Sequence, residues 1–212
     1  MAKAEFKIIG SSPARIGGVE RVVGKGVYGI DLMLKDQLHG AILRSQYAHA
    51  KILSVDTSEA KKIPGVHAVV TADDAPNVRY GRSYIDRHIL ARGKVRFMGD
   101  PVAAVAAESL AIARQALKKI KVAYEPLPVV IDPEEATKPH SPVLHEDMPL
   151  PKSIPADAGI KNVCGHMVVR VGDAEKAMAE ADVVVEEAYE TKMIHAQYLE
   201  PRIAAAQMEP NG

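Results

Sequence analysis

Alternating and continuous apolar stretches predict where the strands lie in the first two thirds of the chain. Leu38–Arg44 is a short apolar stretch, Ala50–Asp56 alternates between apolar and polar side chains, and Val66–Thr71 is another short strand-like run. Pro101–Ala107 is apolar throughout, which is typical of a strand covered on both faces. Val122–Ile131 is extended, and its prolines indicate an edge or crossing position because proline has no N–H to donate to a neighbouring strand.

A short helix is expected between the second and third of these strands. Thr57 or Ser58 can cap Glu59–Ile63, because a hydroxyl oxygen accepts from the free N–H groups of a first helical turn. Pro64–Gly65 would end this helix. Ala50–Thr71 is therefore expected to form a compact β-α-β unit.

A longer helix is expected at Leu110–Lys119, with Ser109 as its N-terminal cap. Its lysines fall in the last turn, where they suit the negative end of the helix dipole. Its apolar side chains fall on one stripe, formed by Leu110, Ala113, Leu117 and Ile120. Strands and helices in this order predict a mixed α/β (α+β) fold.

The last third of the chain has a different pattern. Six prolines between Asp132 and Val163 indicate a long surface connection or interdomain linker. Beyond it, His166–Val171 and Val183–Ile194 are expected to be strands, with a short helix at Glu175–Ala181 between them.

Composition and charge exclude several classes of function. The 212 residues are 47% apolar and 25% charged, as in an average globular protein. The chain has 27 basic residues (Lys and Arg) and 27 acidic residues (Asp and Glu). It therefore lacks the excess of basic residues that is typical of proteins that bind nucleic acid. No apolar stretch approaches the roughly 20 residues that cross a bilayer, and the N-terminus lacks the apolar stretch of a signal peptide. We therefore expect a cytoplasmic protein that binds neither nucleic acid nor membrane.

The single cysteine, Cys164, limits metal and redox chemistry. A disulfide needs two cysteines, a structural zinc site usually two or more, and an iron–sulfur cluster normally four. His166 lies two residues further on, so the two side chains would share one face of a strand and could form a nucleophile–base pair. No third group orients the histidine, and a small buried thiol is the more common role.

Gly24–Gly29 matches the G-x-G-x-x-G pattern of dinucleotide-binding loops. Such a site needs a preceding strand, a following helix whose N-terminus meets the pyrophosphate, and an acidic residue about 20 positions further on. Val22–Val23 could end a strand, but Ile30–Asp36 has no amphipathic helical pattern and no strand ends in an acidic residue at that spacing. The glycines are therefore expected to form a turn.

The nearest approach to a metal-ligand cluster is formed by His140, His145, Glu146 and Asp147. These residues lie among the prolines, and their spacing matches neither two histidines on one helix face nor a zinc motif. A solvated loop is the favoured interpretation, and no metal site is predicted.

Other polar residues have ordinary structural roles as their simplest explanation. His49 and His195 each precede an alanine in strongly patterned stretches and are expected to be structural histidines. Asp132, Glu134 and Glu135 surround a proline and are expected to form a first helical turn or a solvated corner. No group of residues by itself indicates catalysis, so no catalytic residue is predicted.

A series of motifs in fixed order resembles one protein family. The motifs are Gly24–Asp31, Leu38–Ser45, Ala48–Ile52, Ile63–Thr71, Val95–Ala107, Tyr124–Pro128 and Asp132–Ala136. Together they resemble the N-terminal α/β-hammerhead domain of the large subunit of molybdenum hydroxylases, the xanthine dehydrogenase and aldehyde oxidase family. Within that family the carbon monoxide dehydrogenase, nicotinate dehydrogenase and 4-hydroxybenzoyl-CoA reductase types look nearest. The resemblance is specific to the family and not to a substrate.

The end of the chain extends this resemblance. Ala181–Glu186 and His195–Ala206 are similar to the opening of the molybdopterin-binding domain that follows the hammerhead domain in the family. The implied organisation is a hammerhead domain over residues 1–144, a proline-rich connection over 145–165, and an incomplete molybdopterin-binding domain over 166–212. The apolar tail from about Val183 is expected to be an interface, and the candidate interface residues are His195, Tyr198, Glu200 and Pro201.

The resemblance implies part of an enzyme. The family's glutamine- and glycine-rich pterin loops and its catalytic glutamate are expected downstream of Gly212, so this chain would be a non-catalytic N-terminal segment or split subunit that scaffolds the molybdenum domain. The chain alone would hold no cofactor. The alternative is a stand-alone structural or ligand-binding module that keeps the fold without the activity.

The resemblance also implies what the assembled oxidoreductase would contain. Its cofactors would be a molybdopterin-type molybdenum cofactor, iron–sulfur clusters and, in many members, FAD. The partners of this chain would be the remaining molybdopterin-binding domain or subunit, an iron–sulfur subunit and, in many members, a flavin subunit.

Overall fold

The computed structural model describes residues 8–82 and 84–209, which belong to two units. The larger unit spans Gln37–Val184. The smaller unit combines the N-terminal residues up to Asp36 with the C-terminal residues from Val185. Both ends of the chain therefore contribute to the same unit.

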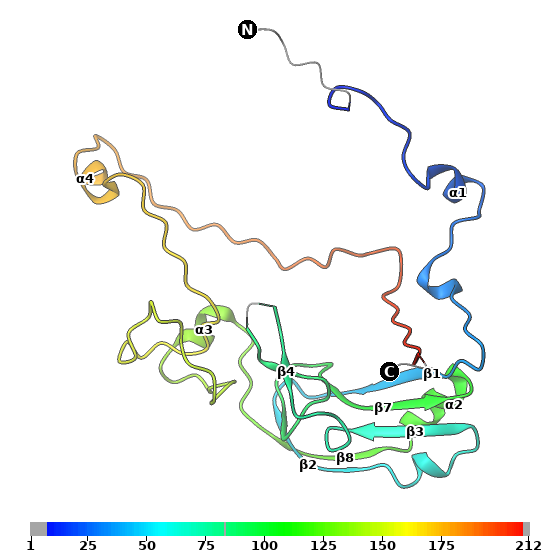
Figure 1. The fold of residues 1–212 in the computed structure, drawn as a ribbon. Coiled ribbons are helices and arrows are strands. Elements are labelled where there is room, and N and C mark those ends of the chain that lie inside the picture. The colour runs from blue at the N-terminus through cyan, green and yellow to red at the C-terminus, as the bar shows by residue number, and fades with distance from the viewer. Residues whose placement is uncertain (1–7, 83, 210–212) are drawn as a thin grey trace. The chain divides into compact units, whose positions relative to one another are not determined.

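Two small antiparallel sheets form the centre of the larger unit (Figure 1). The strand order is β1-β7-β3 in the first sheet and β6-β2-β8 in the second. The strands are β1 (His39–Arg44), β2 (Ala50–Asp56), β3 (Val66–Thr71), β6 (Lys94–Val95), β7 (Pro101–Ala107) and β8 (Lys121–Pro126). The strands expected in the first two thirds of the chain are thus confirmed, except that the last one ends at Pro126 and not at Ile131. The proline-containing β8 lies at an edge, which is one of the two positions that its sequence indicates.

Strand β7 is covered on both faces, as its continuous apolar sequence predicts. Ala103, Val105 and Ala107 are at most 2% exposed and pack in a core with helix α2 (Leu110–Leu117). Val102 belongs to a second core, which joins the two sheets. Successive side chains of a strand point to opposite faces, so both sets of positions in β7 have to be apolar.

Helix α2 begins where the sequence predicts, because Ser109 Oγ accepts a hydrogen bond from the Ile112 N–H at 3.3 Å. Ala113 and Ala116 are fully buried, and Leu117 packs against the same core. The predicted stripe is wrong at its first position, since Leu110 is 40% exposed. The buried face of the helix is centred on Ala113 and Ala116. The spacing of apolar residues does not by itself determine how the helix is rotated about its axis toward the sheet.

The segment between β2 and β3 differs from the prediction. It is a 3-10 turn, η2 (Ala60–Lys62), without a side-chain cap, and the Ser58 N–H instead donates to Asp56 Oδ1 at 2.9 Å. Strands β2 and β3 lie in different sheets, so Ala50–Thr71 is not a β-α-β unit. A crossover between parallel strands of one sheet needs a dozen residues or more, and the segment before Val66 is shorter.

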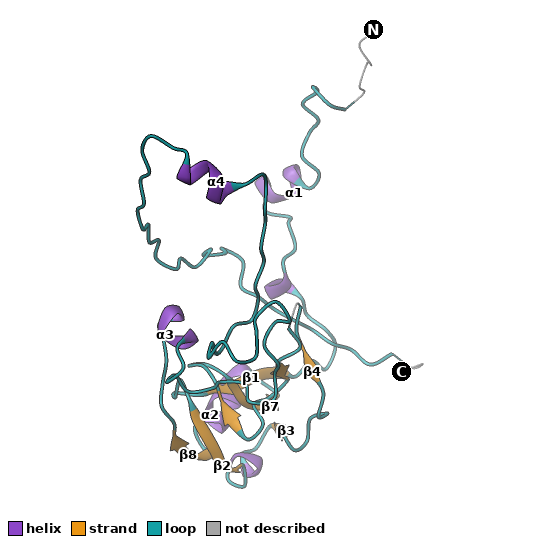
Figure 2. Ribbon diagram, turned by 90° about the vertical axis from the view of Figure 1, so that its left-hand side faces the viewer, coloured by secondary structure: helices purple, strands orange, loops and turns teal. Residues whose placement is uncertain are grey.

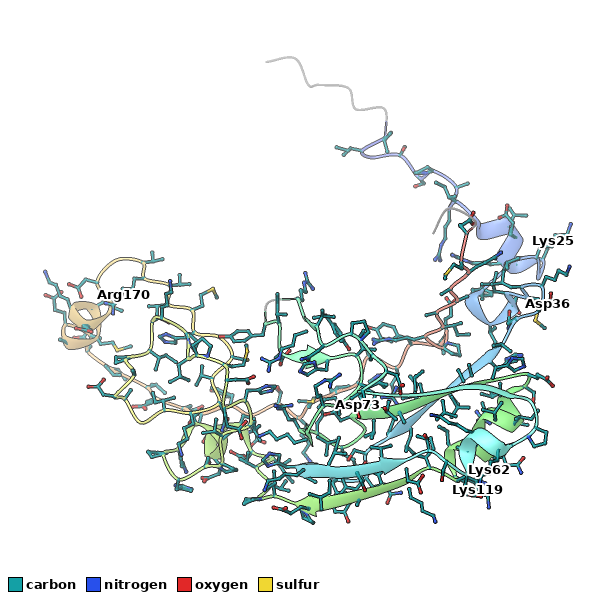
Figure 3. The ribbon with its side chains drawn as sticks, turned by 60° about the horizontal axis from the view of Figure 1, so that its bottom comes forward. Lys25, Asp36, Lys62, Asp73, Lys119 and Arg170 are labelled. Atoms are coloured by element: carbon teal, nitrogen blue, oxygen red, sulfur yellow. The ribbon has the colours of Figure 1, made fainter. Side chains whose placement is uncertain are left out.

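Charged side chains surround these cores. Lys62 at the end of η2 and Lys119 after α2 are both exposed (Figure 3). Positive charge after the last turn of a helix is favourable because the unpaired carbonyl groups there carry partial negative charge.

The polar stretch before β6 contains a short hairpin in which β4 (Arg79–Tyr80) pairs with β5 (Arg87–His88). After β8 the chain enters helix α3 (Pro133–Thr137), which begins at Asp132. Asp132 Oδ1 accepts from the Glu135 N–H at 2.8 Å, which confirms the first-turn interpretation of these carboxylates.

Between α3 and residue 209 the chain is loop apart from one short helix, α4 (Ala174–Ala179), as Figure 2 shows. The predicted strands at His166–Val171 and Val183–Ile194 are wrong, since neither segment forms a strand. An extended segment becomes a strand only by pairing its N–H and C=O groups with a neighbour, and the described residues supply none. In the same described part of the chain, no helix has the length and apolar character of a membrane-spanning segment.

The N-terminal part of the smaller unit contains helix α1 (Gly18–Val22) and the 3-10 turn η1 (Gly29–Asp31). Asp31 Oδ2 accepts from the Tyr28 N–H at 3.0 Å and thereby fixes the start of η1. Gly24 and Gly26 of the G-x-G-x-x-G motif thus lie between α1 and η1, and Gly29 is the first residue of η1.

Candidate functional site

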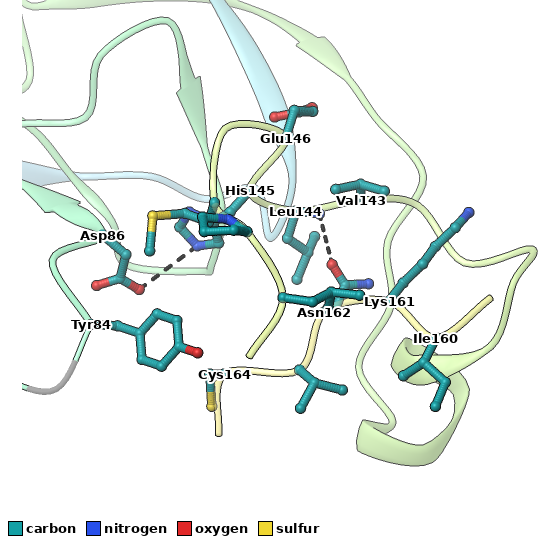
Figure 4. A pocket seen from close by; sticks show the side chains of 14 residues that line it. Tyr84, Asp86, Val143, Leu144, His145, Glu146, Ile160, Lys161, Asn162 and Cys164 are labelled. Atoms are coloured by element: carbon teal, nitrogen blue, oxygen red, sulfur yellow. Dashed lines mark hydrogen bonds and ion pairs between the residues drawn. The ribbon is translucent and has the colours of Figure 1, made fainter. Parts of the chain in front are cut away.

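The larger unit holds a pocket of about 260 Å³, shown in Figure 4. Three stretches line it: residues 84–86 of the β4–β5 hairpin, and residues 143–150 and 160–164 of the connection after α3. The walls are largely apolar, and Val143 and Ile160 are each 38% exposed. The proline-rich connection therefore shapes a concavity instead of running freely over the surface.

Three consecutive residues, His145, Glu146 and Asp147, fasten the connection to the strands. His145 Nε2 lies 3.8 Å from Asp86 Oδ2, and Glu146 Oε1 lies 2.6 Å from Lys94 Nζ. Asp147 forms an ion pair with Arg79. The cluster lies in a loop, as predicted, and the side chains of His140, Glu146 and Asp147 are at least half exposed, but its members also form ion pairs or close contacts with separate side chains. Within the part of the chain that the structure describes, no group of three His, Cys, Asp or Glu side chains could hold a metal ion.

These pairs shift the titration of the carboxyl groups. A hydrogen bond from Lys94, which is only 12% exposed, lowers the pKa of Glu146. A hydrogen bond from Arg79 likewise lowers the pKa of Asp147. Both carboxylates are therefore charged near neutral pH and hold the connection in place electrostatically.

Asn162 links the end of the connection to residues that precede it in the chain by three hydrogen bonds. Its amide nitrogen donates to the carbonyl oxygens of Ala136 and Pro142 at 2.8 and 2.9 Å, and its Oδ1 accepts from the Leu144 N–H at 2.9 Å. The residue has φ 54°, a left-handed conformation that asparagine tolerates better than most residues. No sequence pattern singles out this residue, because its partners lie 18 to 26 positions away.

Cys164 is exposed where the connection lines the pocket, which corrects the expectation of a buried thiol. His166 Nδ1 lies 2.9 Å from Ser153 Oγ. The cysteine–histidine pair was inferred from a strand, and the segment is not a strand. The geometric basis of that pair is therefore absent.

His49 is a structural histidine, as predicted. It is 5% exposed, and its Nδ1 lies 2.7 Å from the carbonyl oxygen of Pro128. Because a carbonyl oxygen only accepts, Nδ1 carries a proton in this contact. The His49 Nε2 atom is buried and has no hydrogen-bond partner among the described residues.

In the smaller unit, the candidate interface residues meet the N-terminal glycine motif. The Gly29 N–H donates to Glu200 Oε1 at 3.2 Å. A Cβ atom at Gly29 would lie 3.3 Å from Ile203 Cβ, so the glycine permits this close approach. Tyr198, Glu200 and Pro201 line an open hollow together with Gly29. The sequence analysis singled out both the glycine motif and the candidate interface residues, but no pattern in the sequence predicts that they are in contact.

The Tyr198 ring contacts one basic and one aromatic side chain, of which Arg202 lines the hollow and His195 does not. The Arg202 guanidinium lies 5.0 Å from its centroid, a cation–π distance. The His195 ring lies edge-on to it, with centroids 6.1 Å apart. His195 Nδ1 also accepts from the Gln197 N–H at 2.9 Å. His195 is exposed, and the interface role of these residues remains a prediction.

The glycine motif forms a turn, as predicted, and helix α1 precedes it where a dinucleotide site would need a strand. Gly24 has φ 72°. The N–H groups of Lys25 and Gly26 donate to the carbonyl oxygen of Glu20 at 2.7 and 2.9 Å. These donors close the end of α1 and do not form a phosphate cradle.

Two family models match the chain in succession. The model of the aldehyde oxidase and xanthine dehydrogenase a/b hammerhead domain matches residues 23–128. The chain belongs to the aldehyde oxidase and xanthine dehydrogenase family. The model of the molybdopterin cofactor-binding domain follows at residues 157–212. The two sheets and helix α2 lie inside the hammerhead match, which confirms the α/β-hammerhead fold.

Several members of the family are similar in sequence. A probable xanthine dehydrogenase component of Bacillus subtilis (strain 168) is 37% identical over 205 residues, covering 95% of this chain and 26% of the relative. The carbon monoxide dehydrogenase large chain of Afipia carboxidovorans is 34% identical over 209 residues, with coverages of 95% and 26%. The chain thus spans about a quarter of the length of these family members.

Solved structures of the family agree in fold. The Cu,Mo-CO dehydrogenase in its carbon monoxide reduced state superposes with a TM-score of 0.67 at 35% identity, covering 82% of this chain and 23% of the other. The reconstituted CO dehydrogenase from Oligotropha carboxidovorans gives a TM-score of 0.61 at 40% identity, with coverages of 66% and 18%.

The described residues do not by themselves form a site that fits the family's molybdopterin cofactor. A cofactor held by backbone groups needs glycines where the chain closely approaches the ligand or a neighbour. An added Cβ at Gly165 or Gly172 would meet nothing within 4 Å, and at Gly159 it would meet only Pro139. No residue of this chain is therefore assigned to hold the cofactor.

Proposed function

We propose that this chain contributes the hammerhead domain and the opening of the molybdopterin-binding domain to a molybdenum hydroxylase, in which it acts as a scaffold. The observation that carries the proposal is the succession of the two family matches along one chain. The first match coincides with a folded core of two sheets and a capped helix. A rigid domain beside a cofactor domain supports a role in positioning that domain.

The relatives support an oxidoreductase that acts on a small molecule. They are named for substrates as different as carbon monoxide and nicotinate. On this basis we infer a small carbonyl, heteroaromatic or acyl-CoA substrate for the assembled enzyme. Electrons would leave through an iron–sulfur subunit and, in many members of the family, a flavin subunit. We place the assembly in the cytoplasm.

The test is metal and pterin analysis of the purified chain with and without the products of its neighbouring genes. We expect molybdenum and pterin in near-equal amounts in a complex that contains this chain, and neither in the chain alone. A chain that forms no complex with those products, and that shows no molybdenum in either preparation, would favour the alternative of a stand-alone module.

A further inference from the structure

We propose that the 260 Å³ pocket of the larger unit binds a small organic cation, namely a protonated amine with an apolar body, and that Asp86 is its counter-charge. The pocket is lined by the β4–β5 hairpin and the connection after α3. It lies within one unit, and residues 160–164 of its lining belong to the start of the molybdopterin cofactor-binding match. The proposal goes beyond the scaffold function.

The Asp86 carboxylate lacks a strong partner. Among the described residues, the one basic side chain within 4 Å of it is His145, whose Nε2 lies 3.8 Å from Asp86 Oδ2. That distance is too long for a hydrogen bond. The Asp86 side chain is 29% exposed. Figure 4 shows it beside the Tyr84 ring and the His145 imidazole.

His145 does not neutralise this carboxylate at neutral pH. Burial is the main cause that lowers the pKa of His145, and the nearby Arg96 lowers it further, against an opposite effect of Asp86. An imidazole whose pKa lies below 6.5 is largely uncharged at pH 7 and above. The carboxylate therefore faces the pocket without a compensating positive charge from this side chain.

The other cations near the pocket bond acceptors other than Asp86. Lys161 Nζ donates to the carbonyl oxygen of Ser141 at 3.0 Å, and Arg96 Nε donates to that of Leu144 at 2.9 Å. Lys94 is paired with Glu146 at 2.6 Å. A partly buried carboxylate beside apolar walls is stabilised by a cation more than the same group in water. A positively charged ligand would supply the close cationic partner that Asp86 lacks among the described residues.

The size and the walls of the pocket indicate the body of the ligand. A volume of about 260 Å³ lies just below the range of about 300–1,000 Å³ that is typical of drug-sized ligands, so the pocket suits a molecule of one ring. The half-exposed Val143 and Ile160 would be covered by an apolar body. The Tyr84 ring offers a further favourable surface for a cation.

Three probes of one shape and different charge test the proposal: phenethylamine, 2-phenylethanol and phenylacetate. Binding to the full chain at pH 7.5 is followed by amide chemical-shift changes at residues 143–150 and 160–164, because ligands of this size bind in the millimolar range. We expect the amine to bind about tenfold more tightly than the alcohol and the carboxylate to bind least.

Two variants locate the effect. Asp86→Asn should remove the preference for the amine and leave binding of the alcohol unchanged. Asp157→Asn is the matched control, because Asp157 is an exposed carboxylate of the same connection that does not line the pocket. Far-ultraviolet circular dichroism confirms that both variants fold.

The proposal is overturned if phenylacetate binds as tightly as phenethylamine, or if Asp86→Asn keeps the amine preference. It also fails if none of the probes shifts the pocket amides at about 10 mM, well above the expected range. None of these outcomes bears on the molybdenum content of the assembled enzyme, so the scaffold function is tested separately.

Discussion

Replacing Leu117 with Asp tests how α2 packs on the first sheet. Leu117 contacts the core that contains Ala113, Ala116 and Val105. The change removes the burial of a leucine side chain, worth about 1.5–3 kcal/mol, and directs a carboxylate toward an apolar core. We expect the free energy of unfolding to fall by roughly 3 kcal/mol. For a unit of this size, that corresponds to a decrease in Tm of roughly 6–12 °C.

The matched control is Leu110→Asp on the same helix. The sequence pattern places Leu110 and Leu117 on one stripe, but Leu110 is 40% exposed and is the first residue of α2. A carboxylate in the first turn is favoured by the helix dipole, by about 0.3–1 kcal/mol. We therefore expect Leu110→Asp to leave Tm unchanged or to raise it slightly.

Both variants are compared with the parent by thermal and urea unfolding, followed by circular dichroism at 222 nm. Equal losses of stability in the two variants would show that the stripe predicted from the sequence faces the core and that the observed rotation of α2 is wrong. A Leu117→Asp variant that unfolds like the parent would refute the packing of α2 against β7 altogether.

Four further outcomes are expected. Ser109→Ala should destabilise the chain by about 1 kcal/mol in urea unfolding, because α2 loses its cap. The pKa values of Glu146 and Asp147 are lowered in the folded chain, so their ion pairs stabilise it near neutral pH. This stabilisation is lost as the pH falls below the ordinary pKa values of 4.5 for Glu146 and 3.8 for Asp147. The protection factors of the amides of residues 143–148, which correct for the intrinsic pH dependence of exchange, should therefore fall below about pH 4, and equal protection at pH 3 and pH 7 would contradict this. Gly29→Val should break the contact with Glu200 and speed exchange at residues 198–203, whereas Glu200→Asp should have a smaller effect. The chain expressed alone should contain no stoichiometric molybdenum, iron or flavin by elemental analysis and absorption spectroscopy, and a visible absorption band would contradict this.

The sequence by itself predicted the elements whose causes are local. Ala50–Asp56 alternates, Pro101–Ala107 is apolar throughout, and Ser109 precedes a helical stripe, so each pattern indicates the type of its element. The family could likewise be inferred from motifs in order, because the hammerhead match spans residues 23–128. Proline in Val122–Ile131 was enough to predict an edge strand, since the missing N–H is a property of the residue.

The tertiary structure determined which strands pair with each other and which extended segments form strands at all. β2 and β3 have strand sequences, but only their neighbours determine that they join different sheets. Val183–Ile194 has a strand sequence and no neighbour to pair with among the described residues, so it remains loop.

The two candidate sites depend on the tertiary structure for the same reason. Asp86 and His145 are 59 positions apart, and Gly29 and Glu200 are 171 apart. No periodicity or capping signal extends over such a distance, because local patterns record only the preferences of one segment. The sequence determines which groups can bind or pair, whereas the packing of the chain determines which of them meet and which, like the Asp86 carboxylate, are left without a strong partner.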